Sequence, residues 1–147
     1  LSRQKVPYIN PKNSNENKCE KGAYVVNLTS HESNVTLVAS GTEVELALKV
    51  QDKLKENNIH SKVVSMPCME LFDKQPEDYR KDILEENSLI ITLEAGSVMS
   101  WQKYIKNKGA NLGINKFGES APYKEVYKHF KLSEEDITNF IQKKLRE

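Results

Sequence analysis

The stretch NVTLVASGTEVELA (Asn34–Ala47) decides the fold class. Its first half is apolar and rich in β-branched residues, which is typical of a strand. Gly41 follows, and from there to Leu54 the apolar residues recur with helical spacing. A strand that passes through a glycine turn directly into a helix is the unit from which parallel α/β sheets are built. The stretch therefore predicts an α/β domain and raises the question of whether its turn binds an anion.

The rest of the chain repeats this alternation. Four further β-branched or apolar runs predict strands at Gly22–Leu28, Ser61–Met66, Ser88–Gly96 and Ala110–Ile114. The helical pattern predicts short helices from Pro76, at Ser100–Ile105 and near Tyr123–Phe130, and a last helix from Glu134 that Ser133 and Asp136 begin with a capping box. Pro76 suits the first helical position. Because strands alternate with helices, we expect one domain with a mostly parallel sheet between helices.

Composition excludes two classes of partner. The 147 residues suit a single compact domain. The 22 basic and 21 acidic side chains are interspersed and give a net charge of +1, so the sequence predicts no nucleic-acid partner and no membrane partner. The chain opens without a basic-then-apolar leader, and we expect a cytoplasmic protein. It begins with Leu1 rather than Met, and we expect it to be a fragment of a longer protein.

Cysteines and histidines give no metal pattern. Cys19 and Cys68 lie far apart, without a CxxC motif, and we expect both to be free thiols in a reducing compartment. The histidines His31, His60 and His129 are scattered through polar segments, and we expect them on the solvated surface.

The turn at Gly41 is ambiguous from sequence. It precedes a helix N-terminus, where free N–H groups favour anions, but it has one glycine where a dinucleotide fingerprint has three, and it lacks the lysine of a P-loop. Thr42 and Glu45 have the spacing of a capping box, and Glu43 adds a second carboxylate to the first turn. Carboxylates there would repel a phosphate, which favours a structural cap and leaves a ligand site as the alternative.

Four other side chains are candidates. Glu94 follows an apolar strand and could act as a base or contact a ribose, or could be a structural acid that caps the next segment. Trp101 and Tyr104 are predicted to be aromatic residues of the core or of a subunit interface. Arg3, in LSRQ, could bind a phosphate in a bidentate way or be an ordinary surface arginine.

Several motifs together resemble one family. The segments LSRQ, ASGTEVELA, VVSMPCMELFDKQ, YRKDIL, LEAG followed by WQKY, and FGESAP occur in this order and spacing, and they resemble the C-terminal domain of transketolase over nearly the whole chain. The resemblance implies a single three-layer, Rossmann-like domain whose five-stranded sheet is mixed, with one antiparallel strand that the sequence pattern does not identify. It also implies that residues 1–21 are the end of the pyrimidine-binding domain and a linker, and that residues 22–147 are the C-terminal domain.

The same resemblance implies a function. Transketolases are homodimers that use thiamine diphosphate and a divalent metal ion, Mg or Ca, to move a two-carbon ketol unit from a ketose phosphate to an aldose phosphate in the pentose phosphate pathway. Arg3 would then contact the terminal phosphate of the substrate in the full-length enzyme. The resemblance places the catalytic, cofactor-binding and metal-binding residues in other domains, so the isolated chain is expected to bind no cofactor and to be inactive.

Three alternatives stay open. The chain could belong to a related thiamine diphosphate enzyme, such as dihydroxyacetone synthase or deoxyxylulose-phosphate synthase. It could be a stand-alone or regulatory module that binds a small anion or nucleotide at Gly41, Thr42 and Glu94. It could also be a structural dimerisation domain with a buried apolar patch around Trp101. One departure is local: Lys131 stands where the family commonly has glycine, which argues against a left-handed helix ending there.

Overall fold

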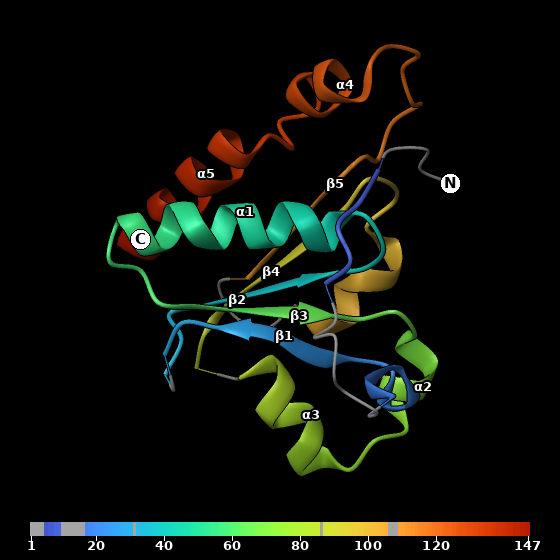
Figure 1. Ribbon diagram of the computed structural model, residues 1–147, viewed down its shortest axis with the longest axis vertical. Helices are drawn as coiled ribbons and strands as arrows, with labels where there is room; N and C mark the ends of the chain where they lie inside the picture. Colours follow the sequence, from blue (N-terminus) through green and yellow to red (C-terminus); the bar gives the residue numbers. More distant parts are fainter. Residues whose placement is uncertain (1–4, 10–16, 31, 86, 106–108) are drawn as a thin grey trace.

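A five-stranded sheet forms the middle layer of the protein (Figure 1). The computed structural model describes residues 5–9, 17–30, 32–85, 87–105 and 109–147. The strands are β1 (Tyr24–Leu28), β2 (Val35–Ala39), β3 (Ser61–Ser65), β4 (Leu89–Glu94) and β5 (Ala110–Gly113), and their order across the sheet is β1-β3-β2-β4-β5. All five lie within the ranges expected from sequence, so the predicted α/β fold is confirmed.

The sheet is mixed because β1 is reversed. β2 pairs in parallel with both β3 and β4, and β4 pairs in parallel with β5, whereas β1 pairs antiparallel with β3. The connection from β1 to β2 spans only residues 29–34, and a parallel arrangement needs a crossover of about a dozen residues or more. β1 therefore runs opposite to the others at the edge of the sheet, and this identifies the antiparallel strand that the sequence left open.

Helices cover both faces of the sheet. The helices are α1 (Glu43–Glu56), α2 (Met69–Asp73), α3 (Glu77–Leu84), α4 (Tyr123–His129) and α5 (Glu134–Arg146), with 3-10 helices η1 (Lys18–Lys21) and η2 (Met99–Tyr104). In Figure 1, α1 and α5 lie on one face, and α2 and α3 lie on the other. Alternate strand residues separate the two cores: Leu37 and Ile91 pack with α1 and α5, whereas Val38 and Ile90 pack with α2, α3 and η2.

The central strands are covered on both faces. All five residues of β2 and the first five of β4 are buried, as expected for parallel strands between helices. The described ranges contain no helix with the length and apolar character needed to cross a membrane.

Helix ends confirm one expectation and correct two. The Ser133 hydroxyl accepts a hydrogen bond from the Asp136 backbone N–H at 3.2 Å, as predicted for the start of α5. Pro76, expected at the first helical position, is instead the extended residue that precedes α3, with ψ of 147°. Lys131 adopts φ of 57° just after α4, so a left-handed helix ending forms there without glycine, contrary to the expectation.

Candidate functional site at the carboxyl ends of β2 and β4

The carboxyl ends of β2 and β4 meet at the point where the chain changes direction across the sheet. β2 leads through α1 to β3 on one side, whereas β4 leads through η2 to β5 on the other. In open α/β sheets, the crevice at such a switch point is the usual place for a ligand. A cavity of about 250 Å³ lies there, and Ser40, Glu94 and Trp101 are among the residues that line it.

The turn at Gly41 faces a buried carboxylate rather than an open anion site. Gly41 has φ of 54°, and Glu43, two residues later, is only 6% exposed. One carboxylate oxygen of Glu43 accepts hydrogen bonds from the Tyr127 hydroxyl at 2.6 Å and from the Thr42 hydroxyl at 2.8 Å. The negative charge therefore sits inside the first turn of α1, where it occupies the positive end of the helix. This arrangement disfavours phosphate at the turn.

The capping box predicted for this turn is wrong. Thr42 precedes α1 but its side chain makes no capping hydrogen bond to the helix backbone. Its hydroxyl donates to Glu43 instead, and Glu45 forms an ion pair with Lys49 at 2.9 Å. The prediction failed because Tyr127 draws the Glu43 carboxylate inward, and that carboxylate then competes for the Thr42 hydroxyl. Glu43 and Glu45 do lie in the first turn of α1, as the expectation placed them.

The carboxylate of Glu94 lines the crevice, and its pKa is raised. Burial raises the pKa of Glu94, the hydrogen bond from Trp101 opposes that rise, and the nearby negative charge of Glu43 adds to it. The Trp101 indole N–H lies 3.2 Å from the carboxylate. Glu94 thus ties η2 to the end of β4, which supports the structural interpretation of this residue. A carboxyl group of this kind suits a hydroxyl or amide ligand better than an anion.

The aromatic residues predicted for the core lie there. Trp101 is 2% exposed and Tyr104 is 5% exposed, and their rings pack edge to face with centroids 6.3 Å apart. Both belong to the buried core on the α2 and α3 side, which confirms the core interpretation of these two residues.

Of the remaining candidates that the structure describes, only Cys68 lines this crevice. His60, in the loop before β3, and His129, on α4, are exposed, and His31 lies outside the described residues. Cys19 and Cys68 are free thiols, as expected. No group of three or more His, Cys, Asp or Glu side chains that could hold a metal ion occurs within the described ranges. Arg3 also lies outside them, so its predicted phosphate contact stays a prediction.

Sequence reasoning missed Tyr127. Its hydroxyl crosses from α4 to Glu43, which lies 84 positions earlier in the chain. Tyr127 sits in a short helix with no motif around it, and helical spacing alone does not say which distant acid its hydroxyl meets.

The comparisons with known proteins agree with this fold. The model of the family described as "Transketolase-like TK C-terminal domain" matches residues 22–133. The chain belongs to this family. The transketolase of Aquifex aeolicus is 35% identical over 146 residues, which cover 98% of this chain and 21% of that protein. The transketolase of Bacillus subtilis is 38% identical over 97% of this chain and 22% of its own length.

Solved transketolases have the same fold. A mutant transketolase from Pichia stipitis superposes with a TM-score of 0.85 at 30% identity, over 98% of this chain and 20% of that chain. A second Pichia stipitis structure, solved with xylulose 5-phosphate, gives 0.79 at 31% identity over 88% of this chain and 18% of that chain. This transketolase C-terminal domain therefore spans about a fifth of the length of the transketolases that it matches.

Proposed function

We propose that this chain is the C-terminal part of a transketolase that moves a two-carbon ketol unit from a ketose phosphate to an aldose phosphate in the pentose phosphate pathway. The family match over residues 22–133 carries the proposal. Identity of 35% over 98% of the chain to the transketolase of Aquifex aeolicus supports it.

Within that enzyme, we assign this chain an architectural role and one substrate contact. Residues 1–21 would end the pyrimidine-binding domain and form the linker, and residues 22–147 would form the C-terminal domain. Arg3 would then bind the terminal phosphate of the sugar, since a guanidinium matches phosphate geometry in a bidentate way.

The cofactor and the metal ion belong, in this proposal, to the rest of the longer protein. The described residues offer no cluster of ligands for a divalent ion, and the Gly41 turn is lined by a buried acid that would repel a diphosphate. Thiamine diphosphate bound elsewhere would supply the chemistry that carries the two-carbon unit. We further propose that the enzyme is a cytoplasmic homodimer.

The Arg3→Ala variant of the full-length protein tests the substrate contact. With xylulose 5-phosphate and ribose 5-phosphate, thiamine diphosphate and magnesium, we expect KM for the sugar phosphates to rise about tenfold, because charge-assisted hydrogen bonds to the phosphate are lost. The affinity for thiamine diphosphate should stay unchanged. Arg146→Ala, which removes an exposed arginine of α5, is the matched control.

The two halves of the proposal can fail separately. An unchanged KM in Arg3→Ala would contradict the role of Arg3 and leave the enzyme class standing. A full-length wild-type protein without ketol transfer would contradict the enzyme class itself.

A further inference from the structure

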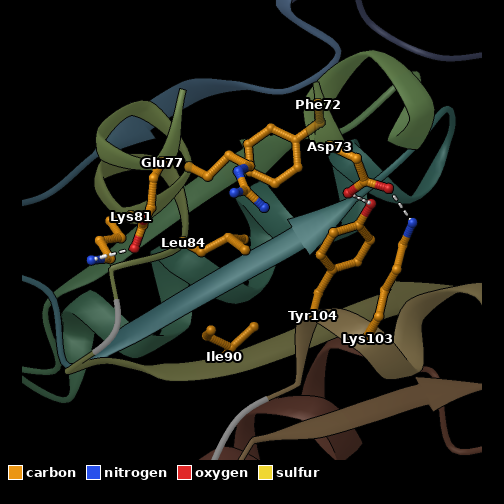
Figure 2. Close-up of a pocket in the computed structure, with 9 residues that line it drawn as sticks. Phe72, Asp73, Glu77, Lys81, Leu84, Ile90, Lys103 and Tyr104 are labelled. Carbon is orange, nitrogen blue, oxygen red and sulfur yellow. Dashed lines mark hydrogen bonds and ion pairs between the residues drawn. The ribbon is translucent and has the colours of Figure 1, made fainter. Parts of the chain in front are cut away.

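A second cavity lies on the opposite face of the sheet from α1. It measures about 340 Å³ and is enclosed by α2, α3, β4 and η2 (Figure 2). Phe72, Leu84 and Ile90 give it an apolar lining, and all three side chains are at least nine-tenths buried. Its volume falls at the lower end of the range for small-molecule sites.

Two acids on its wall already have cationic partners. Asp73 accepts a hydrogen bond from the Tyr104 hydroxyl at 2.8 Å and forms an ion pair with Lys103, as Figure 2 shows. Burial alone would raise the pKa of Asp73, but the hydrogen bonds from Lys103 and Tyr104 outweigh it and hold that pKa below its ordinary value. Glu77 pairs with Lys81 at 2.7 Å, at the other end of the cavity.

Arg80 is the fifth charged residue of this wall; its charge helps to lower the pKa of Asp73, but it forms no ion pair with a carboxylate within the described part of the chain. It lies on α3 and takes part in neither of the two ion pairs. Its Nε atom is buried and has no hydrogen-bond partner within the described part of the chain. Buried polar groups nearly always have a partner, and an unmade hydrogen bond there is costly. The wall therefore carries one positive charge in excess.

We propose that this cavity binds a small carboxylate with an apolar body. The carboxylate would lie against the Arg80 guanidinium, which provides several donors in a rigid plane. The apolar body would lie against Phe72, Leu84 and Ile90. A single excess charge suits a monoanion, because the flanking carboxylates of Asp73 and Glu77 would repel the second charge of a phosphate monoester. The site is independent of ketol transfer, so it can fail or succeed without bearing on the enzyme class.

Ligand-observed fluorine NMR with 4-fluorobenzoate tests the site in the full-length protein that carries this chain. The probe pairs a carboxylate with a compact apolar ring. Neutral 4-fluorobenzamide has the same ring without the charge, and acetate as a competitor has the charge without the ring. We expect saturable binding of 4-fluorobenzoate. 4-Fluorobenzamide should bind much more weakly, and acetate should displace 4-fluorobenzoate only weakly.

Variants then locate the binding. Arg80→Gln keeps a long side chain over the cavity but removes the charge, and should weaken 4-fluorobenzoate binding about tenfold or more. Arg80→Lys keeps the charge without the planar guanidinium group, and its affinity for 4-fluorobenzoate should lie between the affinities of wild type and Arg80→Gln. Arg146→Gln makes the same charge change on an exposed part of α5 and should change nothing. Circular dichroism of each variant confirms that it is folded.

Three outcomes would overturn the proposal. Equal affinity of Arg80→Gln and wild type would place the probe elsewhere. Equal binding of 4-fluorobenzamide would mean that the cavity selects rings rather than carboxylates. Absence of saturable 4-fluorobenzoate binding below about 10 mM would mean that this cavity is not a small-molecule site in the full-length protein.

Discussion

Gly22 and Gly41 form a pair of positions that separates two causes of instability. Both have positive φ, 79° at Gly22 and 54° at Gly41. A Cβ added at Gly22 would lie 2.3 Å from the backbone N of Phe72 and 2.4 Å from the backbone O of Cys68, whereas a Cβ added at Gly41 would meet nothing within 4 Å. Alanine therefore brings backbone strain at both positions and a collision at only one.

The expected magnitudes follow from these contacts. A non-glycine residue in the left-handed conformation lowers the free energy of unfolding by about 1–2 kcal/mol. Alanine also reduces the conformational entropy of the unfolded chain, which raises the free energy of unfolding by about 0.4–1 kcal/mol. Gly41→Ala should then destabilise the fold by about 1 kcal/mol. The collision at Gly22 is with backbone atoms that cannot rotate away, and such overpacking adds about 1–3 kcal/mol. Gly22→Ala should therefore cost about 3 kcal/mol.

Urea unfolding of the 147-residue chain, followed by far-ultraviolet circular dichroism, measures both values. The reasoning predicts that the midpoint falls for both variants and falls much further for Gly22→Ala. Equal losses at the two positions would refute the claim that close contact between residue 22 and the start of α2 sets this part of the fold.

Three further substitutions test two local features. Lys131→Gly should stabilise the chain by about 1 kcal/mol, because glycine relieves the left-handed strain after α4; Lys124→Gly inside α4 should instead destabilise it by about 1 kcal/mol. Thermal denaturation measures both, and a loss of stability in Lys131→Gly would contradict the strain argument. Burial and the charge of Glu43 raise the pKa of Glu94. The stability that the protonated Glu94 side chain contributes is therefore fully present below the ordinary pKa of 4.5 and is lost as pH rises through the raised pKa. Glu94→Gln, which stays neutral and can still accept from Trp101, should therefore be more stable than wild type at pH 7 and equal to it near pH 4; a variant that is equally or less stable at pH 7 would contradict this.

Much of the sheet could be predicted from sequence because its strands are strongly apolar and its helices keep their period. The reversed direction of β1 was also within reach, since the polar TSHES segment that follows it is too short for a crossover helix. The resemblance to the family predicted one antiparallel strand, and the length of the connection between β1 and β2 identifies that strand as β1.

The details of the candidate sites were not within reach. The side chain of Thr42 failed to cap α1 because Tyr127, far away in the chain, draws Glu43 inward. Sequence spacing describes neighbours on one helix and is silent about such distant partners. The same limit applies to Arg80, whose place on the cavity wall depends on how α2, α3 and η2 meet around it.

Formation of sedoheptulose 7-phosphate and glyceraldehyde 3-phosphate from xylulose 5-phosphate and ribose 5-phosphate is the most direct test of the central claim. The full-length protein that carries this chain should form both products in equal amounts when thiamine diphosphate and magnesium are present, and neither product when thiamine diphosphate is left out. Absence of both products with the cofactor and the metal ion present would contradict the assignment of this chain to a working transketolase.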